Sequence, residues 1–216
     1  MIYYIADCHF YHEKLLERMD KRGFSDVEEM NRYMIERWNG KVRKNDEVVI
    51  LGDFSWGKVE QTSELLSQLN GTLFMIRGNH DYFLDNQEFD KSRFVWIKDY
   101  AEIHDNRRKV VLCHYPIMCY NGQYRLDRKG NSKTYMLYGH VHDTFDQRLL
   151  EQFADITRKS KRMTLGQDGE QEEMFIPCNM INCFCMYSDY EPLTLDEWII
   201  CQEKRLRKQN KVTTVQ

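Results

Sequence analysis

The sequence lacks several features that mark particular classes of protein. Its 31 lysines and arginines do not outnumber its 34 aspartates and glutamates, and the net charge is −3. A duplex nucleic-acid binder usually carries a basic face, so this balance does not favour nucleic acid as a partner, although a local basic patch could be hidden in it. The chain has no run of 18 apolar residues, and no positively charged start followed by a long apolar core. We therefore expect neither a membrane partner nor export.

The cysteines show no disulfide pattern. They number seven, which is odd, and they include no Cys-x-x-Cys pair. Cys183 and Cys185 would point to the same side of a strand, which does not suit a disulfide between them. Because disulfides persist mainly in oxidising compartments, we expect reduced thiols and a cytoplasmic protein.

Length and composition predict one folded domain. A chain of 216 residues with 42% hydrophobic residues can bury a sizeable core, and it contains no internal repeat, no convincing linker and no pattern that predicts an oligomeric state. We expect a single domain over residues 1–206 and a polar tail at 207–216. The stretch 157–173 is strongly charged and contains Gly166 and Gly169, and we expect a mobile hairpin or loop there.

Short apolar runs that end abruptly in polar residues recur as far as His142. Runs of this length, bounded by glycine or aspartate, are typical of buried strands. Open α/β sheets bind their ligands at the carboxyl ends of strands, which is where these polar residues fall. The runs are Ile2–Ala6 before Asp7-Cys8-His9, Val48–Leu51 before Gly52-Asp53, Leu73–Ile76 before Arg77-Gly78-Asn79-His80-Asp81, Val110–Cys113 before His114, and Tyr135–Tyr138 before Gly139-His140-Val141-His142.

Helical periodicity fits between the early runs. It predicts one helix from Val27 to Trp38, ended by Asn39-Gly40, and a second from Val59 to Leu69, closed by Asn70-Gly71. After residue 92 the helical signals thin out and short strands follow one another, which predicts a second, more antiparallel sheet. A last strand at Met180–Tyr187 and an amphipathic helix at Leu195–Leu206 complete the expected elements.

The histidines are clustered at the predicted strand ends. Taken alone, a histidine at a strand end is more often a satisfied polar residue than a ligand, and short motifs such as Gly-Asp arise by chance. Histidines without a shared role would instead be scattered through helices and loops. Five of the seven fall at these ends, namely His9, His80, His114, His140 and His142. The set as a whole therefore predicts a metal centre.

The ligand types indicate two transition-metal ions. Imidazole nitrogens with carboxylate and amide oxygens suit Mn, Fe, Zn, Co or Ni better than a thiolate-rich structural zinc site does. Paired ions lie about 3.5–4 Å apart, so one ligand must reach both. Asp53, with glycine before it, is the best candidate for that bridge. Asp7 and His9 would point to the same side of a continued strand, whereas His140 and His142 could divide between the two ions.

In their order and at their intervals, the motifs resemble those of the calcineurin-like metallophosphoesterase family. The segment Asp7–His12 is similar to the small bacterial and phage-type branch, where a second histidine follows the first motif. The resemblance spans Met1 to His142 and resumes at Asp189–Trp198. Between them, residues 144–178 are longer than the resemblance leads us to expect, so a charged insertion is expected there, which could be a lid, an oligomer contact or a tolerated extension. No motif carries a substitution; they are Asp7-x-His9, Gly52-Asp53, Gly78-Asn79-His80-Asp81, His114 and Gly139-His140-x-His142.

This resemblance implies a fold, a cofactor and a mechanism. The fold would be α/β, a four-layer α/β/β/α sandwich of two mixed β-sheets flanked by helices. The cofactors would be two divalent transition-metal ions, with Mn first and Fe, Zn, Ni or Co as alternatives. His80 would donate a proton to the leaving oxygen, and a metal-bridging hydroxide would be the nucleophile. The implied ligands are Asp7, His9 and His142 for one ion, Asn79, His114 and His140 for the other, and Asp53 as the bridge.

Two further residues are candidates for contacting substrate or supporting the site. The segment Tyr115–Lys133 joins two ligand-bearing strands, so we expect it to pass near the site. Within it, Arg125 could bind a substrate phosphate, or it could be a solvated loop residue. His12 could orient a substrate oxygen or a metal ligand, or it could simply begin a surface helix.

The function expected from the motifs is hydrolysis of a phosphodiester or phosphomonoester, on a small nucleotide-like substrate. One alternative is a metal-dependent nuclease. It would need a basic track for the nucleic acid, which the net charge of −3 does not indicate. Another is a binding or scaffold protein on the same fold. Such proteins typically lose ligands or the proton donor, whereas this chain keeps them all.

Overall fold

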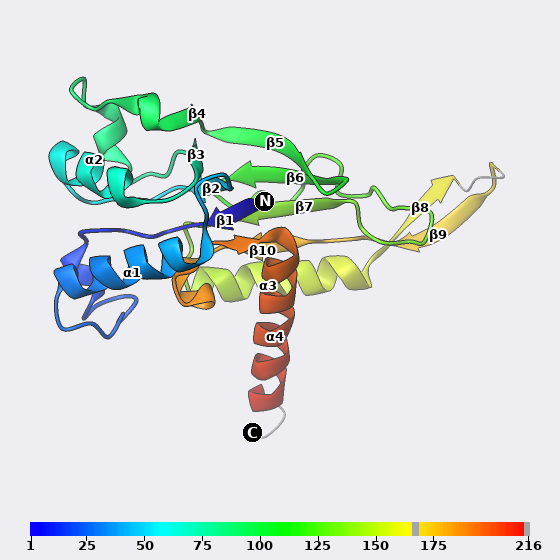
Figure 1. Cartoon of the computed structure of the whole chain (residues 1–216). Coiled ribbons are helices and arrows are strands. Elements are labelled where there is room, and N and C mark those ends of the chain that lie inside the picture. The colour runs from blue at the N-terminus through cyan, green and yellow to red at the C-terminus, as the bar shows by residue number, and fades with distance from the viewer. Residues whose placement is uncertain (166–168, 214–216) are drawn as a thin grey trace.

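The computed structural model describes residues 1–165 and 169–213, with side chains described as far as residue 208, and these contain two large β-sheets (Figure 1). The first sheet has the strand order β11-β1-β2-β3-β4. Strands β1 to β4 are parallel and β11 is antiparallel to β1, so the sheet is mixed. Its strands are β1 (Ile2–Ile5), β2 (Glu47–Leu51), β3 (Thr72–Ile76), β4 (Phe94–Lys98) and β11 (Leu193–Thr194).

The second sheet has the strand order β10-β7-β6-β5 and is also mixed. Strands β10, β7 and β6 are parallel, and β5 is antiparallel to β6. These strands are β5 (Tyr100–Asp105), β6 (Arg108–Cys113), β7 (Thr134–Tyr138) and β10 (Met180–Asn182). The β5–β6 pair is antiparallel, as expected after residue 92, but the other two pairings of this sheet are parallel.

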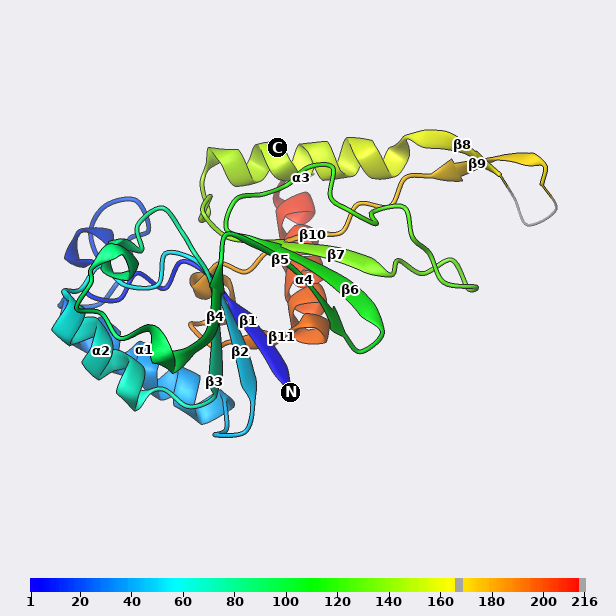
Figure 2. The same ribbon diagram turned by 90° about the horizontal axis from the view of Figure 1, so that it is seen from above.

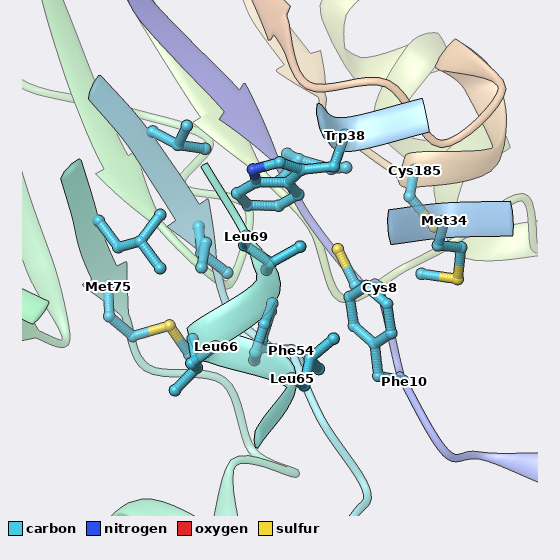
Figure 3. Packing of buried hydrophobic residues seen from close by; sticks show 14 of the residues in the cluster. Cys8, Phe10, Met34, Trp38, Phe54, Leu65, Leu66, Leu69, Met75 and Cys185 are labelled. Carbon is cyan, nitrogen blue, oxygen red and sulfur yellow. The ribbon is translucent and has the colours of Figure 1, made fainter. Parts of the chain in front are cut away.

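Two helices, α1 (Val27–Lys41) and α2 (Val59–Gln68), cover the outer face of the first sheet (Figure 2). The side chain of Asp26 accepts a hydrogen bond from Glu29 N at 2.7 Å and so caps the start of α1. The apolar residues of both helices recur at helical spacing and so share one face. Trp38 of α1 and Leu65 of α2 therefore point into the buried cluster that lies between these helices and the sheet (Figure 3).

A second cluster lies between the two sheets. Leu51 of β2 and Val110 of β6 are fully buried in it, from opposite sheets. Helix α4 (Leu195–Thr213) closes one side, because its Trp198 is buried in the same cluster and donates a hydrogen bond from its indole nitrogen to Tyr4 O at 2.9 Å. Of the helices described, none combines the length and the apolar character needed to cross a membrane.

The remaining helix, α3 (Phe145–Lys159), covers the outer face of the second sheet (Figure 2). Thr144 caps its start, and Leu150 and Ala154 are buried in one cluster with Met136 of β7. The layers are therefore α1 with α2, the first sheet, the second sheet and α3. This confirms the expected α/β/β/α sandwich of two mixed sheets flanked by helices.

The structure divides the segment expected to be an insertion. Its first half is α3, a layer of the sandwich. Its second half is an antiparallel hairpin of β8 (Lys161–Leu165) and β9 (Gln171–Phe175), which projects from the body of the molecule (Figure 2). A hydrogen bond of 3.0 Å from Ile176 N to Ser160 O closes the base of this hairpin. Residues 166–168 of the expected mobile loop lie outside the described residues.

The polar tail expected from residue 207 differs in the structure, because helix α4 continues to Thr213. Residues 207–213 therefore prolong a helix that the sequence pattern ended at Leu206. Residues 214–216 of the expected tail lie outside the described residues.

Removing the hairpin should leave the metal centre intact. Joining Ser160 to Ile176 through a short Gly-Ser linker keeps α3 and every candidate ligand, so metal content and secondary structure should match the full chain. Leu150→Ala is the contrasting variant, since it opens a cavity under α3 and should lower the free energy of unfolding by about 2–5 kcal/mol. Denaturant unfolding measures the stability of each variant, and elemental analysis measures its metal content. Loss of folding and of metal on hairpin removal would show that the hairpin belongs to the core.

Candidate metal centre

The polar residues after β1, β2, β3, β6 and β7 meet at one end of the sandwich. Backbone hydrogen bonds join the segments that carry them. Asp7 N donates to Gly52 O at 3.1 Å, and Gly139 N donates to His114 O at 3.0 Å. The carboxyl ends of the parallel strands thus lie at a shared edge, as the sequence pattern predicted.

Asp7, His9 and His142 form a buried group on one side of this edge. Nε2 of His9 lies 3.2 Å from Nε2 of His142, and the latter lies 3.8 Å from Asp7 Oδ1. Two nitrogens bound to one ion at about 2.0–2.1 Å, with an angle of about 90–110°, are about 3.0–3.4 Å apart. The separation of the two imidazoles therefore fits shared coordination of one ion. The three residues offer ligand atoms within 4.8 Å of one another.

Asn79, His114 and His140 form a second group beside the first. Asn79 Oδ1 lies 3.1 Å from His114 Nε2 and 2.9 Å from His140 Nδ1. His114 is oriented by its other ring nitrogen, which lies 2.8 Å from Leu51 O and donates to it. That hydrogen bond leaves Nε2 of His114 free to act as a ligand.

Asp53 lies between the two groups. Its Oδ2 is 3.5 Å from His9 Nε2 and 3.6 Å from His114 Nε2. Its other oxygen, Oδ1, accepts a hydrogen bond from His80 N at 2.8 Å. One carboxylate oxygen thus faces nitrogens of both groups while the second oxygen holds the carboxylate in place, a geometry that suits a bridging ligand.

Left-handed backbone conformations are concentrated at these residues. The φ angles are 54° at Asp7, 49° at His9, 50° at Asp53, 70° at His140 and 48° at His142. A non-glycine residue in this region carries strain, which is typically retained at functional sites. The turns aim successive side chains at a common point instead of alternating them across a strand.

The glycines of the motifs leave room for the ligands. A Cβ on Gly139 would lie 2.6 Å from Asp7 Oδ2. A Cβ on Gly52 would collide with the imidazole of His114, and one on Gly78 with the backbone and carboxylate of Asp53. The absence of a side chain at these positions therefore allows the candidate ligands to approach one another.

Asp81 joins two of the ligand-bearing turns. Its carboxylate accepts hydrogen bonds from Gly78 N at 2.7 Å, Phe54 N at 2.8 Å and Asp53 N at 2.9 Å. Asp81 also precedes the short 3-10 helix Tyr82–Asp85, but its side chain makes no cap hydrogen bond to it. Burial raises the pKa of this carboxyl to about 6.

Asp20 and Arg22 lie behind the candidate ligands and hydrogen-bond His142 and the turn after β1. The sequence motifs did not indicate either residue. Asp20 Oδ1 accepts a hydrogen bond from His142 Nδ1 at 2.7 Å, which leaves Nε2 of that imidazole to face the candidate metal position. Arg22 is buried and donates to Asp20 Oδ2 at 2.9 Å and 3.0 Å. It also donates to Asp7 O at 3.0 Å and Cys8 O at 2.6 Å. The pair therefore holds His142 and the turn after β1 together.

Asp20→Asn should weaken binding of the ion held by His142 by about 10-fold to 100-fold, because the imidazole loses the carboxylate that orients it. The ion at Asn79, His114 and His140 should be retained. Competition with a metal chelator measures both affinities. Asp26→Asn is the matched control, since asparagine also caps α1 and lies outside the site. Unchanged affinity for both ions in Asp20→Asn would contradict this role.

His80 and His12 lie at the edge of the first group. The ring of His80 is 5.8 Å from that of His9, and the ring of His12 is 5.3 Å from it. His12 stacks on Trp56 with the ring centroids 4.1 Å apart, and burial, with the charge of Arg22, lowers its pKa to about 4. Among the described side chains, the buried Nδ1 atoms of His9, His12 and His80 have no hydrogen-bond partner.

Arg125 lies away from the candidate ligands. Its side chain is next to Gly122, which packs on Thr134, and Thr134 starts β7 at the end opposite to His140. Tyr115 is the residue of the same loop that lies at the site. Its hydroxyl is 3.4 Å from Asn79 Oδ1, and its ring is 4.5 Å from that of His140. The structure therefore does not bring Arg125 together with the other candidates.

The electrostatics of the site suit bound cations. Burial raises the pKa of Asp7 and lowers the pKa of His9, as expected for groups that lack compensating charge. At His142 burial opposes protonation, but the hydrogen bond to Asp20 and the charge of Asp7 outweigh it and raise the pKa. Positive ions among these groups would favour ionised Asp7 and neutral imidazoles, which are the forms that bind metal. The nitrogen and oxygen donor set fits divalent transition metals.

Comparisons with known proteins agree with this geometry. The model of the calcineurin-like phosphoesterase family matches residues 1–175. An uncharacterized protein of Methanocaldococcus jannaschii is 34% identical over 167 residues, which cover 76% of this chain and 80% of that protein. The crystal structure of a protein of unknown function from Aquifex aeolicus matches with a TM-score of 0.61 and 22% identity, over 91% of this chain and 96% of that one. This structural match bears on the fold alone.

Proposed function

The chain belongs to the calcineurin-like phosphoesterase family, and from this premise we propose that it hydrolyses a phosphodiester or phosphomonoester at a centre of two divalent metal ions. The observation that carries the proposal is the position of Asp53, whose Oδ2 lies at similar distances from His9 and His114. A single carboxylate oxygen between two groups of nitrogen and oxygen donors is what a paired-metal site requires.

The metal set follows from the donor atoms. Asp7, His9 and His142 would hold one ion and Asn79, His114 and His140 the other, with Asp53 shared. When bound, the two ions would act as Lewis acids that stabilise charge on the phosphoryl oxygens and activate the attacking water. We propose Mn first, and Fe, Zn, Ni or Co as alternatives, because the set contains oxygens and no thiolate.

His80 is proposed as the general acid. Its backbone N–H is fixed on Asp53 Oδ1, so its imidazole is held beside the first metal group rather than within it. As the bond between phosphorus and the leaving oxygen breaks, protonated His80 would transfer its proton to that oxygen, which departs as an alcohol. The neutral imidazole is then reprotonated from solvent.

We propose a small phosphate ester as the substrate, with a nuclease as the alternative. A nuclease would need a basic track beside the site, and the net charge of −3 does not supply one. Efficient cleavage of long DNA with a steep dependence on salt would instead favour the nuclease. All seven cysteines are free thiols, which suits the cytoplasmic location that we propose.

A panel of esters tests the function. Metal should be removed with a chelator and restored with Mn, Fe, Zn, Ni or Co. Hydrolysis of nitrophenyl monoesters and diesters should then be lost and regained in step with metal content. Full metal occupancy without hydrolysis of any ester would contradict the proposal and favour a binding or scaffold protein on this fold.

A further inference from the structure

Trp56 is an exposed aromatic residue at the edge of the metal centre. It follows Asp53 in the turn after β2, and 42% of its surface is exposed. An exposed apolar residue needs no explanation by itself. The position of this ring is informative, however, because its centroid lies 4.7 Å from that of His80 and 6.3 Å from that of His9.

The backbone holds Trp56 in this position. Trp56 N donates to Phe10 O at 2.8 Å. Ser55 is buried, and its hydroxyl hydrogen-bonds Thr62 at 2.8 Å and accepts from Gly57 N at 3.1 Å. The turn is therefore tied to the segment after β1 and to α2. A large ring on so constrained a turn is preorganised for contact with a ligand.

The rings of His12 and Tyr82 lie with that of Trp56 around His80, and we call these three rings the corner. One face of Trp56 stacks on His12, with the planes 9° apart. Tyr82, which is 62% exposed, stands edge-on to both rings, 6.1 Å from Trp56 at 77° and 6.0 Å from His80 at 74°. The exposed surface of Trp56 and Tyr82 therefore borders the imidazole that is proposed as the proton donor.

We propose that Trp56 and Tyr82 bind the leaving group of the substrate, and that this group carries a planar ring, as a nucleoside does. The inference rests on the proposed function, because it takes His80 as the residue beside the leaving oxygen. Whatever is attached to that oxygen must then lie against the corner formed by these rings. Bases stack on aromatic side chains through a face that every base presents.

The surroundings favour a small molecule over a nucleic-acid strand. Proteins that bind single strands combine stacked aromatics with a basic groove that follows the phosphates. Asp85, in the same short helix as Tyr82, is paired with Arg77, and Lys58 lies on the same shallow surface as Tyr82 and Glu60. These two basic side chains each lie with an acidic one, so they do not form a basic groove. The occupant we propose is one nucleoside unit.

The test compares substrates that differ only in the base. Adenosine 5′-phosphate and ribose 5-phosphate share the same leaving oxygen. The methyl diesters of both compounds allow the same comparison if the enzyme prefers diesters to monoesters. With the metal-loaded full chain, Trp56→Ala should lower kcat/KM for the adenosine esters by about 10-fold to 100-fold. The loss on the ribose esters should be clearly smaller, because they lack the ring that stacks, and Trp56→Phe should retain most of the difference between the two kinds of ester.

Binding of adenosine to the metal-free protein provides a second readout. Calorimetry should show the Kd of adenosine raised by a similar factor in Trp56→Ala and in Tyr82→Ala. Tyr124→Ala is the matched control, since that exposed tyrosine lies against Arg162 of the hairpin and should have no effect.

Equal losses on adenosine and ribose esters, or an unchanged Kd for adenosine in Trp56→Ala, would overturn the inference even if the wild-type chain hydrolyses esters. A Trp56→Ala variant impaired mainly on single-stranded oligonucleotides would also overturn it, in favour of strand binding. Absence of metal-dependent hydrolysis in the wild-type chain would instead count against the proposed function, and adenosine binding would then still decide whether the corner takes a planar ring.

Discussion

Asp53→Asn is expected to reduce the metal content from about two ions per chain to almost none and to abolish hydrolysis. The reason lies in the two oxygens of Asp53. Oδ1 accepts the hydrogen bond from His80 N, so an asparagine would keep its carbonyl oxygen there and turn its NH2 group toward His9 and His114. A neutral donor cannot bridge two cations. Removing one electrostatic group from an active site costs about 10²–10³ in kcat, so loss of both ions should exceed that.

Elemental analysis and ester hydrolysis measure this result on the same sample. Asp46→Asn is the matched control, because Asp46 precedes β2 at the end opposite to Asp53 and binds the amino terminus and Arg43 N instead. Its metal content and rates should equal those of the wild-type chain. An Asp53→Asn variant that kept both ions and near-normal rates would show that Asp53 is not the bridge.

His80→Asn is expected to discriminate between leaving groups while both ions stay bound. A nitrophenolate departs readily as an anion, whereas a nucleoside or alkyl oxygen needs a proton. General acid catalysis contributes about 10²–10⁴-fold, so the alkyl and nucleoside esters should slow by that factor and the nitrophenyl esters much less. His104→Asn, an exposed histidine on β5, is the control and should change neither rate.

The competing explanation for His80 is purely structural. In that case the residue would shape the Gly-Asn-His-Asp turn and keep Asn79 in position, and the variant would lose one ion. Parallel measurement of metal stoichiometry and of rates on two esters separates the explanations. Equal losses on both esters, together with a missing ion, would contradict the proton-donor role.

The strand ends could be predicted from the sequence because each one is determined by a few consecutive residues. A short apolar run followed by Gly-Asp or Gly-His is visible within a few residues, and parallel strands bring such ends to one edge. Helix α3 was included in an expected insertion because residues 144–178 are longer than the family resemblance leads us to expect, and exposed apolar residues such as Phe145 and Ile156 obscure its buried face. Its buried face rests on few residues, among them Leu150 and Ala154.

The residues that support the site could not be predicted in the same way. Asp20 contacts His142 across 122 positions in the sequence, from a segment without periodicity or a known motif. Arg125 was a candidate, with a solvated loop residue as the alternative, because its loop joins two ligand-bearing strands. Since β6 and β7 are parallel, however, the connection must return the length of the sheet. Its start, at Tyr115, lies by the ligands, whereas Arg125 lies toward the start of β7.

Anomalous diffraction from crystals of the Mn-loaded protein is the most direct test of the paired-metal centre, because it locates the ions without reference to activity. Two peaks about 3.5–4 Å apart are expected, one between Asp7, His9 and His142 and the other between Asn79, His114 and His140, with the carboxylate of Asp53 in contact with both. A single peak, or two peaks without Asp53 between them, would contradict a centre bridged by Asp53.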